Sequence, residues 1–184
     1  MYAILTLLNV QGHFKIEELW NWLELDCGLS GVQATPLPHF SWMGMQECDV
    51  DRVLEVMGEI AAEQTIFNAY SAGVGLFTGP APVLYLPIAN SIPMLHCHAQ
   101  IWQKLAPFVS EPNLYYQTGQ WFPHVTLASR DLDLIGLGCA VQGLMHRTME
   151  LEITVDHFAL AYYYSLSDTG VVKRFDFLNA RDRQ

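Results

Sequence analysis

The sequence repeats one five-residue pattern, as PHFSW at residues 38–42 and as PHVTL at residues 123–127. Each copy reads proline, histidine, apolar residue, hydroxyl residue, apolar residue, and the two histidines stand 124 − 39 = 85 residues apart. The three-residue core alone is weak evidence, because His146 and Thr148 repeat it with no preceding proline, where a predicted helix gives way to a strand. The two full copies gain weight because they occupy equivalent places in a repeated order of secondary structure.

That order follows from hydrophobic periodicity and turn residues. In the first half of the chain, strands are expected over 2–10, 38–45 and 67–77, and helices over 15–25 and 50–64. Asp49 or Asp51 can cap the second of these helices. In the second half, the patterns predict strands over 83–89, 121–129 and 149–165, helices over 94–109 and 133–147, and a loop over 110–120. Residues 171–178 are expected to pair with the strand at 149–165.

Each half thus reads strand, helix, histidine strand, helix, strand. This repeat predicts an α+β fold, a single bilobal domain over residues 1–184 with lobes of about residues 1–80 and 81–184. The lobes would be related by a pseudo-twofold axis. Two antiparallel sheets would line a central cleft with helices on their outer faces, so that the two repeated motifs face each other across the cleft.

The composition is typical of a folded domain with few charges. Of the 184 residues, 51% are hydrophobic and 15% are charged, and the formal net charge is −10. No Lys or Arg occurs between Arg52 and Lys104, so the chain lacks the basic surface that binding of long nucleic acids needs. A small anionic ligand held by a few groups is compatible with this charge, because net charge does not describe a pocket.

The four cysteines, at positions 27, 48, 97 and 139, form no C-x-x-C pair, which argues against zinc ribbons and thioredoxin-like chemistry. Reduced thiols in a cytoplasmic protein are the expectation. The apolar opening MYAILTLLNV has no basic region and no small-residue cleavage site, so it is interpreted as a strand. No stretch approaches the roughly 20 apolar residues that a membrane helix needs, and a monomer without membrane association is expected.

The spacing of the repeated pattern has a direct chemical use. Because residues i and i+2 of a strand point to the same face, His39 projects together with Ser41, and His124 with Thr126. One neutral imidazole can accept a proton while a second, protonated imidazole donates one to a leaving oxygen. The hydroxyls can donate to the non-bridging oxygens of a phosphate. A phosphodiester that water attacks in line with the departing ribose oxygen fits between two such arms.

This chemistry requires no metal ion or other cofactor. No carboxylate lies between Gln33 and Gln46, and the first carboxylate after His124 is Asp131, whereas hard metal ions prefer clustered carboxylates. Two histidines without a neighbouring Cys or carboxylate also make a poor zinc site. A metal-dependent hydrolase is therefore disfavoured.

At these motifs the chain resembles the 2H phosphoesterase superfamily, the group of 2′-5′ RNA ligase-like and cyclic phosphodiesterase proteins, which is defined by two H-x-[ST]-x motifs. FPHVTLASR at residues 122–130 is similar to the family's F-x-P-H-[ILV]-T-L-A-R stretch, with Arg130 one place later than in the commonest form. FNAYSAGVGLFTGPAPVLYLPI at 67–88 resembles the family's middle strands, although Thr78 and Gly79 replace the usual proline. The first motif is the looser match, because Ser41 replaces the commoner Thr.

The resemblance implies a bilobal fold and metal-independent attack on 2′,3′-cyclic or 2′,5′-linked phosphodiesters of nucleotides or RNA ends, with hydrolysis and ligation both open. It implies that His39 and His124 are general acid and base, in either order, and that Ser41 and Thr126 bind the phosphate. The expected partner is a small nucleotide or an RNA end. The alternative is a non-catalytic module of the same type that binds a nucleotide or RNA terminus, and the presence of both histidines and both hydroxyls favours the enzyme.

Three further residues are candidates for substrate binding. Arg130 shares the strand parity of His124 and is the basic residue closest in sequence to either motif, so it could hold the phosphate. Phe122 has the same parity, and Tyr115 lies in the preceding loop, where aromatic rings can stack on a nucleobase or form a plain hydrophobic flap. His96 and His98 are expected at a helix surface, and the tyrosine run at 162–164 is expected in the core and on a sheet face. His13 and His157 have no partners in the sequence.

Overall fold

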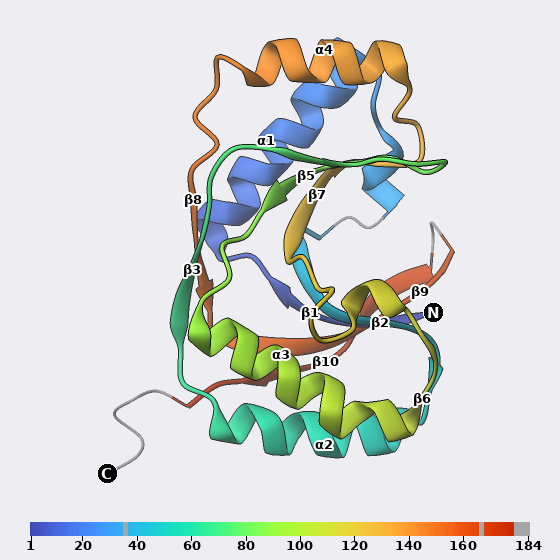
Figure 1. Cartoon of the computed structure of the whole chain (residues 1–184), viewed down its shortest axis with the longest axis vertical. Coiled ribbons are helices and arrows are strands. Elements are labelled where there is room, and N and C mark those ends of the chain that lie inside the picture. Colours follow the sequence, from blue (N-terminus) through green and yellow to red (C-terminus); the bar gives the residue numbers. More distant parts are fainter. Residues whose placement is uncertain (35–36, 166–167, 179–184) are drawn as a thin grey trace.

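The computed structural model describes residues 1–34, 37–165 and 168–178 (Figure 1). The helices and strands follow one another as β1 (Tyr2–Leu7), α1 (Val10–Cys27), the 3₁₀ helix η1 (Gly31–Ala34), β2 (His39–Cys48), α2 (Val50–Glu63), β3 (Phe67–Ser71), β4 (Gly75–Phe77), β5 (Val83–Pro87), α3 (Ile92–Leu105), η2 (Ala106–Phe108), β6 (Val109–Pro112), η3 (Leu114–Tyr116), β7 (His124–Ala128), α4 (Leu134–Leu144), β8 (Leu151–Val155), β9 (His157–Ser165) and β10 (Asp168–Asp176).

Each long helix begins at a side chain that accepts a hydrogen bond from a backbone N–H group of the first turn, as helix N-termini require. Asn9 caps α1, Asp49 caps α2, Ser91 caps α3 and Asp133 caps α4. The capping role predicted for Asp49 is confirmed. Helix α1 starts at Val10 rather than at residue 15, because the Asn9 cap ends the first strand earlier than its apolar run suggested.

One antiparallel sheet has the strand order β10-β9-β1-β2-β6. Its central strand, β1, pairs with β2 on one side and with β9 on the other. Helices α2 and α3 pack against this sheet, α2 on β9 and β10 and α3 on β2. In Figure 1 these two helices lie together at the lower end of the molecule.

The other strands form a second antiparallel surface. Strand β5 lies between β4 and β7, and β3 pairs with β8. A bridge between Ser71 and Ile88, and a hydrogen bond from the Ala89 N–H to the Tyr70 carbonyl, connect β3 to the end of β5. The strand predicted over 67–77 is therefore interrupted between β3 and β4, where Gly73 has a φ of 75°. Both pieces lie beside β5 and the residues that follow it. Helices α1 and α4 pack on this side of the molecule.

The two antiparallel surfaces each combine elements from both halves of the sequence. Helix α1 follows β1 yet packs against β7 and β8, and β9 follows the second histidine strand yet pairs with β1. The mixed fold with antiparallel sheets and covering helices agrees with the prediction. Lobes of residues 1–80 and 81–184 do not describe these sheets, because each sheet takes strands from both halves.

Two further segments differ from the sequence expectation. The run predicted as one strand at 149–165 is broken at Asp156, so that β8 joins β3 while β9 joins β1. The loop predicted over 110–120 contains part of β6, which pairs with the far end of β2, and then the 3₁₀ helix η3. The predicted pairing of 171–178 with the preceding strand is confirmed as the β9–β10 hairpin.

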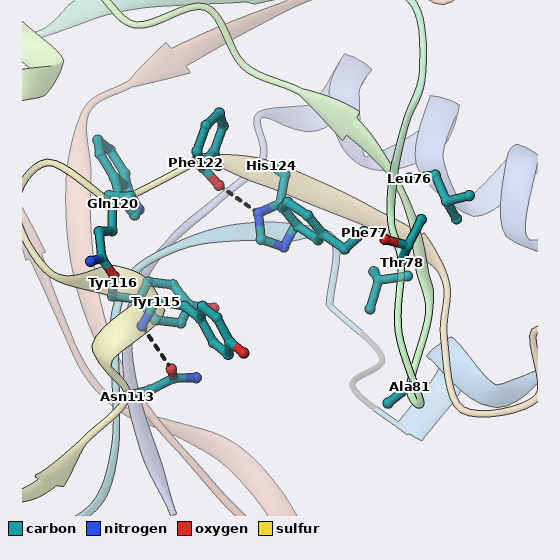
Figure 2. A pocket seen from close by; sticks show the side chains of 12 residues that line it. Leu76, Phe77, Thr78, Ala81, Asn113, Tyr115, Tyr116, Gln120, Phe122 and His124 are labelled. Carbon is teal, nitrogen blue, oxygen red and sulfur yellow. Dashed lines mark hydrogen bonds between the residues drawn. The ribbon is translucent and has the colours of Figure 1, made fainter.

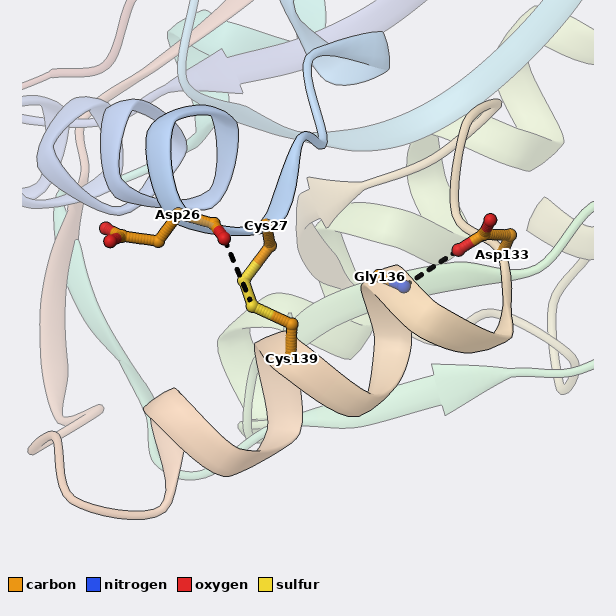
Figure 3. The surroundings of a disulfide bond; sticks show 5 residues. All are labelled: Asp26, Cys27, Asp133, Gly136 and Cys139. Atoms are coloured by element: carbon orange, nitrogen blue, oxygen red, sulfur yellow. Dashed lines mark hydrogen bonds between the residues drawn. A yellow bond between two sulfur atoms is a disulfide. The ribbon is translucent and has the colours of Figure 1, made fainter.

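A disulfide joins Cys27, at the end of α1, to Cys139 in α4 (Figure 3). The expectation of reduced thiols is therefore wrong for this pair, because the fold brings together two cysteines that are 112 residues apart in sequence. Cys48 and Cys97 are free. Among the described residues, no helix is long and apolar enough to span a membrane.

Candidate active site

The two repeated motifs have the same position in their sheets. His39 pairs with Leu7 at the end of β1, and His124 pairs with Pro87 at the end of β5. The prolines before the two histidines also bond to these strands. The Leu8 N–H donates to the Pro38 carbonyl at 3.0 Å, and the Ile88 N–H donates to the Pro123 carbonyl at 2.9 Å. The prolines thus open each strand while their carbonyls remain in the ladder.

The strand register shifts at the same point after each motif. Leu5 pairs with Ser41 but Ile4 pairs with Met43, and Tyr85 pairs with Thr126 but Leu84 pairs with Ala128. Such a bulge places two consecutive residues on one face, and both pairs, Trp42 with Met43 and Leu127 with Ala128, are buried. The histidine and hydroxyl residue of each motif therefore share one face, and the residues between and after them enter the core, as the period of two predicted.

Each histidine is anchored by a backbone carbonyl two residues before it. His39 Nδ1 lies 2.6 Å from the Leu37 carbonyl oxygen, and His124 Nδ1 lies 2.6 Å from that of Phe122. A carbonyl can only accept, so each Nδ1 carries a proton and donates it, which makes Nε2 the basic nitrogen of the neutral ring. Both rings are thereby held in the same tautomer, with Nε2 available for proton transfer.

A tryptophan supports the hydroxyl residue of each motif from behind. The Trp121 indole N–H donates to the Ser41 carbonyl at 3.0 Å, and the Trp20 indole N–H donates to the Thr126 carbonyl at 3.0 Å. Because Trp20 belongs to α1 and Trp121 precedes β7, each bond ties a histidine strand to an element from the other half of the sequence. The backbone of both motifs is fixed independently of any ligand.

The two site histidines interact electrostatically. Burial lowers the pKa of His39, and the positive charge of His124 lowers it further, while the hydrogen bond to Leu37 acts in the opposite direction. Burial also lowers the pKa of His124, again opposed by its carbonyl partner. Because each shift disfavours the imidazolium, the fold favours neutral rings, and an anionic ligand would favour protonation of one of them.

His124 projects into a cavity of about 510 Å³ with aromatic walls (Figure 2). Phe77 and Tyr85 pack against the His124 ring with centroid distances of 5.0 and 5.2 Å. Tyr115 and Phe122 also line this cavity, and their side chains are 81% and 65% exposed. These two rings are therefore accessible to a ligand, and their contact with a substrate stays a prediction.

His39 and Ser41 line a second cavity of about 410 Å³. Asn113 and Tyr116 line both cavities and so form the wall between them. Thr126 lies opposite Tyr85 on the adjoining strand and is half-buried. The structure thus places one histidine in each cavity, with their common wall between them.

Tyr116 is a site residue that the sequence did not reveal. Burial raises the pKa of its hydroxyl, and its interaction with the Ser41 side chain lowers that pKa. Its ring lies beside Gly44 on β2, where an added Cβ atom would come within 3.5 Å of it. In the sequence it is one of several aromatic residues in a loop, and nothing local distinguishes it from Tyr115.

His98 supports the same loop. The expectation that it lies on the helix surface is wrong, because its side chain is buried. Its Nε2 lies 2.8 Å from the Tyr116 carbonyl oxygen, and its ring stacks on Trp121 at a centroid distance of 4.1 Å. His98 therefore fixes both Tyr116 and the tryptophan that bonds to Ser41. Only its packing partners, which come from distant sequence, identify this role.

His157 supports the end of β1 next to His39. Its Nε2 accepts a hydrogen bond from the Leu7 N–H at 3.1 Å, and its Nδ1 lies 2.5 Å from an Asp156 carboxylate oxygen. Since Leu7 is the strand partner of His39, this buried histidine stabilises the strand end on which the first motif depends.

Arg130 crosses from the end of β7 to the rim of the second cavity. The backbone φ of Arg130 is 71°, and the Asp131 N–H donates to the Ser129 carbonyl at 2.9 Å. Residues 129–131 therefore form a γ-turn, and its positive φ makes it the rarer of the two γ-turn types. This turn accommodates the extra residue that places Arg130 one position late. The guanidinium bonds to the Tyr163 hydroxyl at 3.3 Å and lies 5.3 Å from the ring centroid. Tyr163 itself lines the second cavity.

No group of three or more His, Cys, Asp or Glu side chains that could hold a metal ion occurs in the described part of the chain. The two motifs supply imidazole and hydroxyl groups instead. These groups suit the transfer of protons and the binding of a phosphate.

Comparison with solved structures shows the same fold over nearly the whole chain. TT0787 of Thermus thermophilus superposes with a TM-score of 0.67 at 17% identity, covering 97% of this chain and 98% of that one. Escherichia coli LigT complexed with NADP+ gives a TM-score of 0.58 at 13% identity, covering 96% of each chain. A structure described as a phosphoesterase gives 0.58 at 13% identity, covering 96% and 97%.

No curated protein matches the chain in sequence. The family model of the 2′-5′ RNA ligase superfamily matches residues 15–165, which include both histidine motifs, the aromatic loop between them and the strands that carry them. By this match, which spans more than half of its length, the chain belongs to the 2′-5′ RNA ligase superfamily.

Proposed function

We propose that the chain is a metal-independent phosphodiesterase that acts on 2′,3′-cyclic or 2′,5′-linked phosphodiesters of small nucleotides or RNA ends. The observation that carries this proposal is the matched pair of histidines, each with Nδ1 anchored on a carbonyl and Nε2 left basic. Two equivalent imidazoles whose charges interact would be suited to simultaneous proton removal and proton donation at a phosphate bound between them.

In this mechanism one neutral histidine accepts a proton from water as the water oxygen attacks phosphorus. The other histidine, protonated, donates its proton to the ribose oxygen as the bond from phosphorus to that oxygen breaks. A cyclic substrate yields a nucleoside monophosphate, and a 2′,5′-linked substrate yields two fragments. His39 and His124 can take either role. The same groups would serve ligation if a ribose 5′-hydroxyl replaced water, attacked the phosphorus of a 2′,3′-cyclic phosphate and displaced the 3′ oxygen, which would take up the donated proton.

The hydroxyl residues and Arg130 hold the phosphate. Ser41 and Thr126 share a strand face with their histidines, so their hydroxyls would donate to the non-bridging oxygens as charge develops there. Arg130 would approach the same oxygens from the rim by leaving the Tyr163 hydroxyl. Phe122 and Tyr115 would contact the nucleobase beside His124.

The test is turnover of a 2′,3′-cyclic nucleotide in excess EDTA. Wild-type turnover is expected to survive the chelator and to fall by about 10²–10⁴-fold in His39→Ala and in His124→Ala, the range that general acid–base groups contribute. His146→Ala is the matched control, because it removes the exposed histidine of the third H-x-T sequence. It should leave the rate unchanged.

A pH–rate profile tests the roles directly. Two histidines that act as acid and base should give a bell-shaped profile, so a flat profile between pH 5 and 8 would contradict the mechanism. Absence of turnover on every cyclic or 2′,5′-linked substrate would overturn the enzymatic proposal. Nucleotide binding without turnover would instead support the alternative, a non-catalytic nucleotide or RNA-end binding module.

A further inference from the structure

The cavities that hold the two histidines share one wall. His124 lines the first cavity and His39 the second, while Asn113 and Tyr116 line both. Figure 2 shows Asn113 and Tyr116 beside the cavity into which His124 projects. A phosphate that both histidines reach would therefore lie against this shared wall, where the chemistry of Asn113 and Tyr116 acts on it directly.

The strand β2 provides a place for the Tyr116 ring next to the first motif. The bulge after Ser41 buries two consecutive residues, Trp42 and Met43. Gly44 is therefore the next residue on the face that lines the second cavity. Because Gly44 has no side chain, the Tyr116 ring packs over it, 3.5 Å from the position of an added Cβ atom. From this place the Tyr116 hydroxyl interacts with the Ser41 side chain.

Hydrogen bonds within the protein hold Tyr116 in this position. The Asn113 N–H donates to the Gly44 carbonyl at 2.8 Å, and the Tyr116 N–H donates to the Asn113 carbonyl at 3.0 Å. The buried ring of His98 bonds to the Tyr116 carbonyl at 2.8 Å. Donors that are fixed before a substrate arrives need no reorganisation during the reaction, and such donors stabilise a transition state most effectively.

The shared wall presents hydrogen-bond donors. The side-chain oxygen of Asn113 accepts the Tyr115 N–H at 3.1 Å (Figure 2), so the amide nitrogen, with its two N–H groups, is left to donate. Burial raises the pKa of Tyr116 by more than the Ser41 interaction lowers it, so the hydroxyl keeps its proton at neutral pH. Both groups suit a ligand that is rich in acceptor oxygens and carries negative charge.

We propose that Tyr116 is a further catalytic residue, whose hydroxyl donates a hydrogen bond to a non-bridging oxygen of the scissile phosphate, with the Asn113 amide as a second donor from the same wall. This inference rests on the proposed function. The phenolic proton stays on Tyr116, and the two histidines carry out the proton transfers. The bond strengthens as negative charge develops on the non-bridging oxygen, so it stabilises the transition state more than the bound substrate.

The first experiment removes each donor and keeps its packing. Tyr116→Phe retains the ring over Gly44, and kcat for a 2′,3′-cyclic nucleotide should fall by about 10²–10³-fold, with a much smaller change in KM, as for loss of one oxyanion-hole donor. Asn113→Asp retains the oxygen that accepts the Tyr115 N–H but replaces the donor with a carboxylate, so it should also lower kcat. Tyr70→Phe is the matched control. It removes an exposed hydroxyl that bonds to Glu152 on the β3–β8 pair, and it should leave the rate unchanged.

The second experiment separates direct contact from an effect through Ser41. The two diastereomers of a 2′,3′-cyclic phosphorothioate each carry sulfur in place of a different non-bridging oxygen, and sulfur is a weak acceptor. One diastereomer should be slowed strongly in the wild type and much less in Tyr116→Phe, because the bond to that oxygen is already missing in the variant. The other should be slowed equally in both proteins. If both diastereomers were slowed equally in the two proteins, the direct contact would be overturned.

Turnover by the wild type together with an unchanged kcat in Tyr116→Phe would overturn the inference and leave the proposed function intact. Absence of wild-type turnover would reject the proposed function, and binding would then test the phosphate contact by itself. The measured quantity is the ratio of Kd for adenosine to Kd for its 3′-monophosphate. A smaller ratio in Tyr116→Phe than in the wild type would support the contact, and an equal ratio in the two proteins would reject it as well.

Discussion

The two site histidines share backbone anchoring but are coupled by charge, so a change at one should be visible at the other. Since the positive charge of His124 lowers the pKa of His39, removal of that charge in His124→Ala should raise the pKa of His39. The shift can be measured by NMR titration of the His39 ring carbons, assigned with His39→Ala. The expected direction is toward higher pH.

His13→Ala provides the comparison for this titration, because His13 lies on α1 and pairs with Glu17 rather than with the site. It should leave the His39 titration in place. If His39 titrated at the same pH, or lower, in His124→Ala as in the wild type, the two rings would not be coupled. The proposal of a single phosphate site between them would then lose its electrostatic support.

At the residue scale, the sequence predicted those groups whose identity is set by local spacing. His39, Ser41, His124 and Thr126 follow from a repeated pattern and the period of a strand. Tyr116, in contrast, owes its role to a contact across the cleft. No pattern near Tyr116 encodes its contact with Gly44, because that contact forms only when a loop from the second half of the chain packs on β2.

The glycines of α4 show how an element can be formed by residues with poor helix propensity. An added Cβ atom at Gly143 would lie 2.2 Å from the Trp22 ring of α1, and one at Gly136 would lie 2.7 Å from the Leu29 side chain. These glycines permit the close approach of α1 and α4. Gly138, in contrast, faces open space.

Alanine substitutions at two of these glycines should change the free energy of unfolding in opposite directions. Gly138→Ala should raise the free energy of unfolding by about 0.5–1 kcal/mol, because alanine restricts the unfolded chain and favours the helix. Gly143→Ala should lower it, since Trp22 would have to move. Urea denaturation of the two variants tests this difference, and a loss of stability in Gly138→Ala would contradict the open environment assigned to it.

The disulfide between α1 and α4 closes a loop whose ends are 112 residues apart. Such a cross-link restricts the unfolded chain. The free energy of unfolding of the double variant Cys27→Ser/Cys139→Ser should therefore be about 2–4 kcal/mol lower than that of the wild type. Cys48→Ser, at a free cysteine, should change stability much less. Thiol titration of the denatured, unreduced protein should find Cys48 and Cys97 reactive, and reactivity at all four cysteines would contradict the bond.

The location in the cytoplasm remains a prediction. Disulfides persist mainly in oxidising compartments, so the thiol titration also bears on that prediction when it is made on protein taken directly from its source. The cysteine spacing gave no sign of this bond, because Cys27 and Cys139 come together only when α1 and α4, from different halves of the chain, pack against each other.

At the scale of the whole molecule, the sequence could not predict that strands from the two halves of the chain pair with one another. Local patterns give the order of strands and helices, and that order was largely right. Strand partners are set by long-range packing, and β1 pairs with β9 across most of the chain length. The break at Asp156, a single polar residue between two apolar runs, is the point at which the chain passes from one sheet to the other.

Buried histidines also make the stability of the whole molecule depend on pH. Burial lowers the pKa of His39, His98, His124 and His157 in the folded state. In the unfolded chain these residues return to a pKa of about 6.5. Below that pH the unfolded state therefore binds more protons than the folded state, and the free energy of unfolding falls as the pH falls.

The expected stability is constant above about pH 7 and decreases between about pH 6.5 and 5 by up to about 1.4 kcal/mol per pH unit for each such histidine. Urea denaturation at half-unit intervals measures the slope. His98→Gln should make the slope shallower whatever it does to absolute stability, because it removes a buried titrating ring from α3. His96→Gln, at an exposed position on the same helix, should leave the slope as it is. A slope that is flat, or that rises toward acid, would show that the histidine cluster around the cleft is not held in its neutral form by the fold.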